Sequence, residues 1–219
     1  MINIFRILGD FSHLASIGIL IHTVTTTIAI DGISLKTQVL YALVFLTRYM
    51  DLLSFHWVSL YNTLMKLFFI GSSIYIVVLI QSFQKKNPIA YKEMIMNDTF
   101  KIQFLLIGAL IMSLIFHHKF TLLELLWSFS VWLESVAILP QLFMLSKIGK
   151  APSLTVHYIF SLGIYRFLYI FNWIWRYYSE EKWDYIAIMA GVLQTLLYSD
   201  FFYIYYKKVI KSGKFELPH

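Results

Sequence analysis

Apolar stretches of about 20 residues recur along the whole chain, which is the length a helix needs to cross the hydrocarbon core of a bilayer. The polar segments between them are too short to fold by themselves. The composition agrees, since 59% of the 219 residues are hydrophobic and only 14% are charged, whereas an ordinary globular domain is about 25% charged. We therefore predict an all-α integral membrane protein with no separate soluble domain.

Short polar segments separate the apolar stretches into seven expected spans. The clearest breaks are Asp31-Gly32, the segment 84–98 with its Pro88, and the segments 117–119, 149–152 and 179–184; a tight hairpin is expected at 54–60. The predicted spans are 4–28, 36–54, 57–82, 99–117, 121–146, 153–176 and 183–206. Residues 1–206 would form one seven-helix transmembrane domain, followed by a lysine-rich tail at 207–219.

The uneven distribution of lysines between the two sides of the membrane predicts the orientation of these spans. In a seven-span protein one side holds Lys36, Lys85, Lys86, Lys92, Lys147, Lys150, Lys207, Lys208, Lys211 and Lys214, whereas the other holds Lys119 and Lys182. Because cytosolic loops are enriched in basic residues, the first side is predicted to be cytosolic. The amino terminus would then face the lumen or exterior, and no cleaved signal peptide is expected because Arg6, Asp10 and His13 interrupt the first apolar run.

Several chemistries find no support in the sequence. The chain has no cysteine, so disulfides and thiol catalysis are excluded. We find no metal-ligand set, nucleophile-base pair, glycine-rich phosphate loop or carboxylate dyad at a suitable spacing, and we expect neither an enzyme nor a bound cofactor or metal. The formal charge of +6 comes with lysine-rich loops, and nucleic-acid binding is not expected.

All four arginines lie within or at the ends of predicted spans: Arg6, Arg48, Arg166 and Arg176. An arginine at the centre of a spanning helix costs about 2.5–3.5 kcal/mol on insertion scales unless it faces a cavity or partner. The guanidinium group binds carboxylates with two parallel hydrogen bonds. Arg6 and Arg176 are also placed to snorkel to the surface, and Asp51 could neutralise Arg48. Arg166, near the middle of its span, is the strongest indication of a cavity for an anionic ligand.

Polar residues share helix faces with these arginines. Arg6, Asp10 and His13 follow i, i+4, i+7 spacing on the first span. A polar and aromatic stripe beside Arg166 consists of Tyr165, Tyr169, Asn172, Trp173 and Arg176. Histidine ordinarily has a pKa of about 6.5, so mild acidification would change the charge of this cavity at His13.

Acids and aromatic residues mark two further spans. Span 121–146 carries Glu124 and Trp127 near its lumenal end and Glu134 deeper, and span 183–206 carries Asp200 toward the cytosol. We assign no function to Trp57, Trp132, Trp183, His117 and His118, because such residues at helix ends usually form interfacial belts.

Several stretches resemble one known family: FRILGDFSHL (5–14), RYMDL (48–52), SLYNT (59–63), LESVAILPQLFMLSK (133–147), IYRFLYIFNWIWRYY (164–178) and LLYSDFFYIYYKKV (196–209). The chain is similar over nearly its whole length to the ER lumen protein-retaining receptors, the KDEL/HDEL receptor family. The resemblance implies a seven-helix fold like that of the PQ-loop and SWEET transporters, with two triple-helix bundles joined by a linking helix. Pro140-Gln141 stands where the proline-glutamine pair is expected.

The resemblance also implies a function. Such receptors bind the C-terminal HDEL- or KDEL-type signal of escaped soluble ER proteins in the Golgi, in a pH-dependent manner, and return them to the ER in coatomer-coated vesicles. The expected partners are these peptides, coatomer on the cytosolic side and the lipid bilayer. The expected location is the membrane of the ER and cis-Golgi, with a lumenal amino terminus and a cytosolic carboxyl terminus.

By the same resemblance, individual residues take roles in signal binding. Arg48 with Tyr49 would clamp the terminal carboxylate of the signal, and Arg6 and Arg176 would bind its acidic side chains. The first residue of the signal would lie near Asp51, Glu124 and Trp127. The pocket lining would include Tyr169, Asn172 and Trp173.

Further residues would serve proton sensing and transport. His13, Glu134 and Tyr165 would form the pH switch, and Arg166 would lie beside them in the binding cavity. Residues implied in recycling and in coatomer contact are Asp200, Lys207, Lys208 and Lys211.

Two other functions fit the same sequence features. A SWEET-like transporter of a small anionic or sugar solute would share the fold and the arginine-lined cavity. A lipid-processing membrane enzyme is disfavoured because the catalytic constellation is missing.

Overall fold

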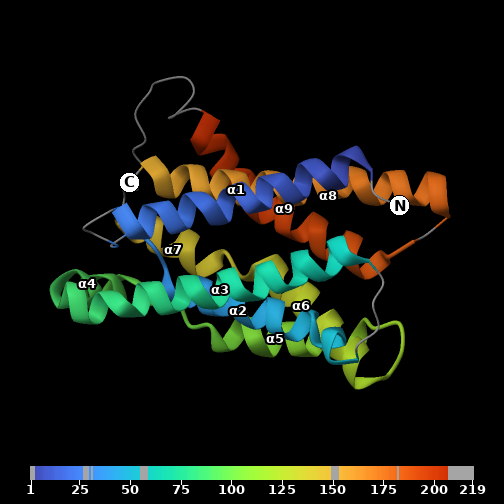
Figure 1. Ribbon diagram of the computed structural model, residues 1–219, viewed down its shortest axis with the longest axis horizontal. Helices are drawn as coiled ribbons and strands as arrows, with labels where there is room; N and C mark the ends of the chain where they lie inside the picture. Colours follow the sequence, from blue (N-terminus) through green and yellow to red (C-terminus); the bar gives the residue numbers. More distant parts are fainter. Residues whose placement is uncertain are drawn as a thin grey trace. The chain divides into compact units, whose positions relative to one another are not determined.

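The structure is a computed structural model that describes residues 3–26, 30, 32–54, 59–148, 153–181 and 183–206. Within these ranges every regular element is a helix (Figure 1). The elements are α1 (Ile4–Thr26), α2 (Leu35–Arg48), the 3₁₀ helix η1 (Met50–Ser54), α3 (Leu60–Lys86), α4 (Pro88–Asn97), α5 (Gln103–Ile115), α6 (Leu122–Val136), α7 (Leu139–Ile148), α8 (Ser153–Glu180) and α9 (Tyr185–Tyr205). The chain divides into two compact units: unit 1 comprises Met1–Ile33 and Leu145–His219, and unit 2 comprises Ser34–Met144.

Four helical stretches in the described ranges are long and apolar enough to cross a membrane: Ile4–Thr26, Leu60–Lys86, Leu122–Ile148 and Tyr185–Tyr203. The helix α5 is apolar but shorter. The 28-residue α8 has the length of a span and carries Arg166, Asn172 and Arg176. These elements agree with a helical membrane protein, whereas the number of spans stays a prediction.

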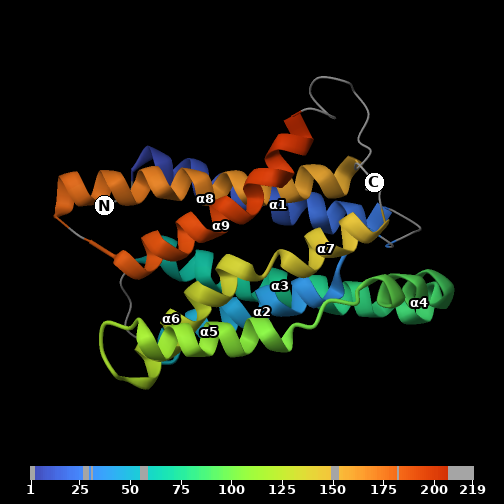
Figure 2. The same cartoon turned by 180° about the vertical axis from the view of Figure 1, so that it is seen from behind.

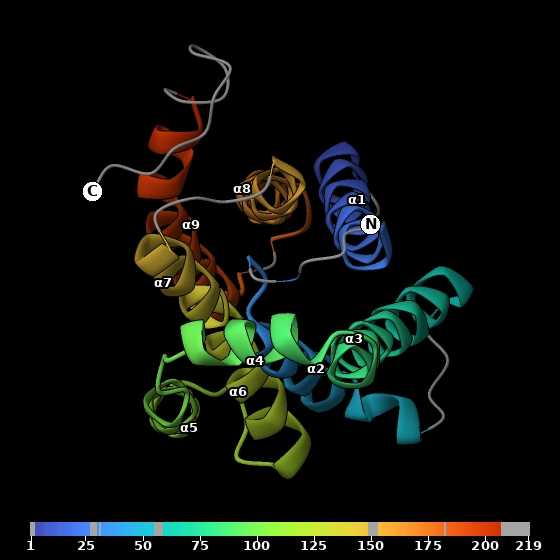
Figure 3. The same cartoon turned by 90° about the vertical axis from the view of Figure 1, so that its left-hand side faces the viewer.

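Unit 1 is built around α8, which packs against α1 and α9. Figure 3 shows α1 and α8 side by side and nearly end-on. The two helices are antiparallel, because Asp10 lies against Tyr169 and the later residue His13 lies against the earlier Tyr165. At Gly9 an added Cβ would lie 2.7 Å from the Tyr169 ring, so only glycine permits this close approach.

The contact of α8 with α9 is also antiparallel. Trp173 packs over Gly191, where any Cβ would overlap the indole ring. Further along, Gly163 of α8 lies against Tyr198 and Phe202 of α9. Small residues at these points let the two backbones approach closely, which is the usual solution for helix packing where lipid surrounds the bundle.

Unit 2 has α2 at its centre, because α2 packs against both α3 and α6 (Figure 2). On the α3 side the ring of Phe45 stacks on Phe69 with centroids 5.3 Å apart. The helix α5 packs against α6, the other helix that contacts α2. The buried apolar residues of these helices include Leu40, Val44, Phe45, Phe69, Ile76, Val131 and Leu133.

Hydrogen bonds fix the start of α2. Ser34 caps the helix by accepting from the Thr37 N–H at 3.1 Å, and its hydroxyl donates to Asp98 Oδ2 at 2.9 Å. The same carboxylate oxygen accepts from the Lys36 N–H at 3.0 Å. Gln141 completes the group, because its Oε1 accepts from the Ser34 N–H at 2.9 Å and its own N–H donates to Thr37 Oγ1 at 3.0 Å. The second residue of the Pro140-Gln141 pair therefore ties α7 to the start of α2.

The helices differ from the predicted spans at several ends and most clearly in two segments. Within the break predicted at 84–98, α3 continues to Lys86 and a separate helix, α4, starts at Pro88, so that only Asn87 is non-helical between them. Asn87 caps α4 through the Ala90 N–H, and proline suits the first helical position because the N–H that it lacks has no partner there anyway. The predicted span 121–146 is interrupted at Ala137–Ile138, just ahead of Pro140, which cannot donate within a continuous helix.

Candidate functional site

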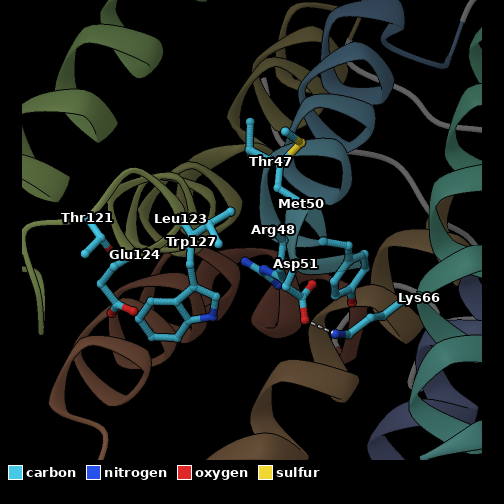
Figure 4. Close-up of a pocket in the computed structure, with 10 residues that line it drawn as sticks. Thr47, Arg48, Met50, Asp51, Lys66, Thr121, Leu123, Glu124 and Trp127 are labelled. Carbon is cyan, nitrogen blue, oxygen red and sulfur yellow. Dashed lines mark hydrogen bonds and ion pairs between the residues drawn. The ribbon is translucent and has the colours of Figure 1, made fainter. Parts of the chain in front are cut away.

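A cavity of about 350 Å³ opens in unit 2 between η1, the end of α2, α3 and the start of α6 (Figure 4). Its lining residues are Thr47, Arg48, Tyr49, Met50, Asp51, Lys66, Thr121, Leu123, Glu124 and Trp127. Five of them were predicted as signal-binding residues from the sequence: Arg48, Tyr49, Asp51, Glu124 and Trp127. The fold brings these five together because α2 ends at the cavity and α6 begins there.

Arg48, the last residue of α2, is held by α6. Its Nη1 forms an ion pair with Glu134, while Nε donates to Ser130 Oγ at 3.1 Å and Nη2 donates to the Ser130 carbonyl at 3.0 Å. The Glu134 side chain is 1% exposed. The sequence reading that Asp51 neutralises Arg48 is therefore wrong, because the counter-ion is a buried glutamate three turns into α6.

Asp51 instead forms an ion pair with Lys66 of α3 (Figure 4). The Lys66 ammonium group also lies 5.8 Å from the centroid of the Tyr49 ring, within the range of a cation–π contact. Asp51 is half-exposed, at 51% of its side chain, so this pair adds little to stability.

The far end of the cavity holds Glu124 and Trp127, which lie beside one another (Figure 4). The Glu124 Oε1 atom is buried and has no hydrogen-bonding partner in the described residues. A buried carboxylate oxygen without a partner is costly. A cationic ligand group placed here would gain both this carboxylate and the face of the Trp127 indole.

A second cluster lies in unit 1, where α1 meets α8. Tyr169 Oη donates to Asp10 Oδ1 at 2.5 Å, and Arg6 Nε lies 3.9 Å from Asp10 Oδ2. The His13 ring stacks on Tyr165 with centroids 4.3 Å apart and planes 10° from parallel. The predicted face of α1 therefore contacts the predicted stripe of α8.

Arg166 is 5% exposed and lies on the side of α8 that meets α9. Its Nε donates to Gln194 Oε1, and its guanidinium carbon lies 5.7 Å from the centroid of the Tyr165 ring and 5.6 Å from that of Trp173. The expectation that Arg166 does not snorkel agrees with this burial.

The remaining residues of α8 lie toward its end. Asn172 Oδ1 accepts from Asn3 Nδ2 at 2.7 Å, and Arg176 Nε lies 3.2 Å from Glu180 Oε2. Asp200 is exposed on α9, six residues beyond Gln194. The tail residues Lys207, Lys208 and Lys211 lie outside the described residues.

The sequence reasoning missed four residues of these sites: Asn3, Lys66, Ser130 and Gln194. Lys66 and Gln194 each carried a signal, since both are strongly polar residues inside predicted spans. Asn3 stands before the first helix, where asparagine is a preferred cap, and its Oδ1 accepts from the Arg6 N–H at 2.9 Å. Ser130 carried no such signal, because a serine in a spanning helix commonly bonds only to its own helix. Among the described residues no group of three or more His, Cys, Asp or Glu could hold a metal ion.

Comparison with known proteins places these residues in a family. The model of the family described as ER lumen protein retaining receptor matches residues 29–176. The chain belongs to the ER lumen protein retaining receptor family. The resemblance noted in the sequence is thereby confirmed, and the match spans both the cavity of unit 2 and the polar stripe of α8.

Full-length members of the family are close to this chain. It is 71% identical over 217 residues to an ER lumen protein-retaining receptor of Saccharomyces cerevisiae, with 99% of each chain covered. It is 62% identical over 219 residues to the protein of that name from Kluyveromyces lactis, with 100% of each covered. ER lumen protein-retaining receptor 2 of Danio rerio is 52% identical over 216 residues, with 99% of each covered. These relatives carry the names of receptors rather than enzymes.

Proposed function

We propose that this protein binds the C-terminal HDEL- or KDEL-type signal of soluble ER proteins that have reached the Golgi, and returns them to the ER by retrograde vesicular transport. Membership of the receptor family supports the retention role. The observation that carries the binding site is the cavity of unit 2. There Arg48 and Lys66 are already paired with acids, while a buried oxygen of Glu124 has no partner within the part of the chain that the structure describes. This arrangement suits a ligand with a carboxylate at one end and a cation at the other.

The polarity of the cavity orients the peptide. Its terminal carboxylate would bind Arg48, next to Tyr49, and its first residue would lie at Glu124 and Trp127, with Asp51 also in reach. In unit 1, Arg6 and Arg176 are the proposed partners of the acidic side chains of the signal, and Arg166, Tyr169, Asn172 and Trp173 are proposed to line the binding site. A buried carboxylate needs such partners because an isolated one is strongly disfavoured.

The Arg48–Glu134 pair gives this binding a dependence on pH. A peptide carboxylate that takes Arg48 deprives Glu134 of its counter-ion, and a buried carboxylate without one is more stable as the neutral acid. Binding would therefore take up a proton, and by linkage it would strengthen as pH falls. Glu134, His13 and Tyr165 remain our proposed pH switch; a contact between Glu134 and Tyr165 would join the two units and stays a prediction.

The proposal includes the topology. Seven spans in a PQ-loop-like pair of triple-helix bundles would put the amino terminus in the lumen and the tail in the cytosol, where Lys207, Lys208 and Lys211 would meet coatomer. Asp200 is proposed to act in recycling. The protein would cycle between the ER and the cis-Golgi.

The test is a comparison of two peptides that differ only at the carboxyl terminus. The free-acid signal peptide should bind the purified protein, whereas the amidated peptide, and the free acid with Arg48→Ala, should each lose at least about tenfold in affinity, since both changes remove the same charge-assisted hydrogen bonds. Lys85→Ala, at the end of α3, is the control. Equal affinity of the acid and the amide for the wild type would disprove the carboxylate clamp.

A transporter is the competing function, because a SWEET-like fold with an arginine-lined cavity suits a small anion or sugar equally well. Reconstitution into proteoliposomes separates the two. Uptake of such a solute, without peptide binding, would support the transporter.

A further inference from the structure

His118, in the segment that joins α5 to α6, lies against the indole of Trp127. The two ring centroids are 5.8 Å apart and the planes are tilted by 34°. Trp127 lines the cavity of unit 2, whereas the His118 side chain is exposed. An exposed titratable ring therefore contacts the aromatic residue at which the first residue of the signal is proposed to lie.

Charge on this ring would act directly on a ligand held by Trp127. Histidine side chains gain a proton in mildly acidic solution, and a cation within about 6 Å of an indole interacts with the same ring electrons that would attract a cationic ligand. A protonated His118 would repel a lysine in the first position of the signal and attract an aspartate there.

The other charged groups around His118 do not cancel this effect. Glu124 lies one turn before Trp127 on α6, Lys119 follows His118 in the chain, and Asp51 and Lys66 lie on the other side of the cavity. The neighbouring His117 packs on Phe120 instead, with centroids 5.3 Å apart.

We propose that His118 determines which first residue of the retrieval signal the receptor prefers, and that its protonation shifts this preference from basic toward acidic residues. The inference rests on the proposed binding of C-terminal signals and adds the residue that tunes their selection. Neutral His118 leaves Glu124 and Trp127 to favour a basic first residue. Protonated His118 offsets them.

The experiment measures the affinities of KDEL- and DDEL-ending free-acid peptides for the purified full-length protein at about pH 5.5 and pH 7.5. Histidine-containing signals are avoided because their own ring titrates. The ratio of the two affinities is the readout. It cancels any proton effect that acts on both peptides alike, including an effect from His13 on their shared carboxylates.

His118→Phe keeps a ring against Trp127 and removes the charge. Because the peptides differ by two unit charges, the variant should raise the KDEL-to-DDEL affinity ratio at pH 5.5 by roughly fourfold relative to the wild type and leave the ratio at pH 7.5 unchanged. His118→Lys should lower that ratio at pH 7.5, because it carries a permanent charge. His117→Phe, the matched control in the same segment, should match the wild type at both pH values.

A wild-type ratio for His118→Phe at pH 5.5, together with a wild-type ratio for His118→Lys at pH 7.5, would overturn the proposal while leaving signal binding intact. The failure of the proposed function looks different, since neither peptide would then bind the wild type. Should His118→Phe not fold, the His118→Lys ratio at pH 7.5 decides the question alone: a lowered ratio supports the proposal and an unchanged ratio overturns it.

Discussion

At the scale of single residues, the site works through pairs in which one partner is already in place. Arg48 is paired with Glu134 and Lys66 with Asp51, and under the proposed function Arg48 would exchange Glu134 for the terminal carboxylate of the signal. Such exchange changes affinity less than capture by a bare arginine would, because one charge pair is lost for each one gained. The ligand affinity would also depend on pH, because the displaced acid can take up a proton.

His13 is the second residue proposed to sense protons, and it is buried against Tyr165 at 7% exposure. Protonation adds positive charge near an anionic ligand, so binding strengthens as pH falls. We expect His13→Ala to weaken peptide binding by roughly tenfold at acidic pH and to flatten the affinity curve between about pH 5.5 and 7.5. His22→Ala, at an exposed position of the same helix, is the control. An unchanged slope in His13→Ala would assign the sensor to Glu134.

The sequence predicts contacts between residues that are close in the chain better than contacts between residues that are far apart in it. Residues on one helix face, such as Arg6, Asp10 and His13, follow from helical spacing alone. The partner of Arg48 did not, because Asp51 is near in sequence whereas Glu134 is 86 positions away, and only the packing of α2 on α6 brings it close. Lys66 was overlooked for the same reason: its ion pair with Asp51 depends on where α3 begins.

At the scale of helices, close packing depends on a few glycines. Trp173 of α8 covers Gly191 of α9 so closely that a Cβ would overlap the indole. We expect Gly191→Ala to displace Trp173 and to destabilise the protein by about 1–3 kcal/mol, the usual cost of overpacking. Thermal unfolding in detergent measures this loss.

Gly18→Ala serves as the matched control. Nothing lies within 4 Å of the added methyl group at Gly18, and alanine favours a helix over glycine by about 0.8–1.0 kcal/mol. This variant should therefore match or exceed the wild type in stability. A loss at Gly18 equal to that at Gly191 would show that steric overlap with Trp173 is not the cause.

The start of α2 carries a buried charge. Burial raises the pKa of Asp98 above its ordinary value of 3.8, although hydrogen bonds from the Lys36 N–H and the Ser34 hydroxyl oppose the shift. A carboxyl group with a raised pKa holds its proton more tightly in the folded state, so stability is lost as pH rises through that pKa. Asp98 is 2% exposed and its Oδ1 has no hydrogen-bonding partner in the described residues.

Asp98→Asn should therefore raise the Tm at neutral pH, by about 2–4 °C for each kcal/mol recovered in a chain of this size. The gain should vanish as the pH falls far enough to protonate the wild-type carboxyl group as well. Asp98→Ala should instead lower the Tm at every pH, because the Lys36 N–H and the Ser34 hydroxyl lose their acceptor. A lower Tm for Asp98→Asn at neutral pH would mean that the charge at the helix start outweighs its burial.

The helix boundaries show where polar residues and prolines in the sequence indicate the ends of helices and where they do not. The break expected at Asp31-Gly32 falls between α1, described to Thr26, and α2, which starts at Leu35; Gly32 is in a turn and Asp31 lies outside the described residues. Charge and proline indicated a break between spans at 84–98, and the structure adds that most of this segment is helical. Pro88 instead occupies the first turn of α4, where it favours the helix.

At the scale of the whole molecule, binding and transport are proposed to use opposite sides of the membrane. Replacing Lys207, Lys208 and Lys211 with alanine should leave peptide affinity within about twofold while ER residents are secreted, because rim charges far from a site change its affinity little. The measurements are peptide affinity in detergent and secreted cargo in cells. A loss of affinity in detergent would contradict this separation.

The single-residue break at Asn87 has a consequence for how deep unit 2 sits in a bilayer. The helix α3 has 27 residues, about 40 Å of helix, which exceeds the hydrocarbon layer of about 30 Å. A helix longer than the hydrocarbon layer can tilt or shift along the membrane normal. The next helix, α4, exposes Ile89 and Met96 on one face, at 81% and 58%, and we propose that this face lies in the headgroup boundary. If α3 spans the bilayer as proposed, we expect this face to limit how far α3 slides, so that α4 at one leaflet would set the depth of the Arg48 cavity toward the other.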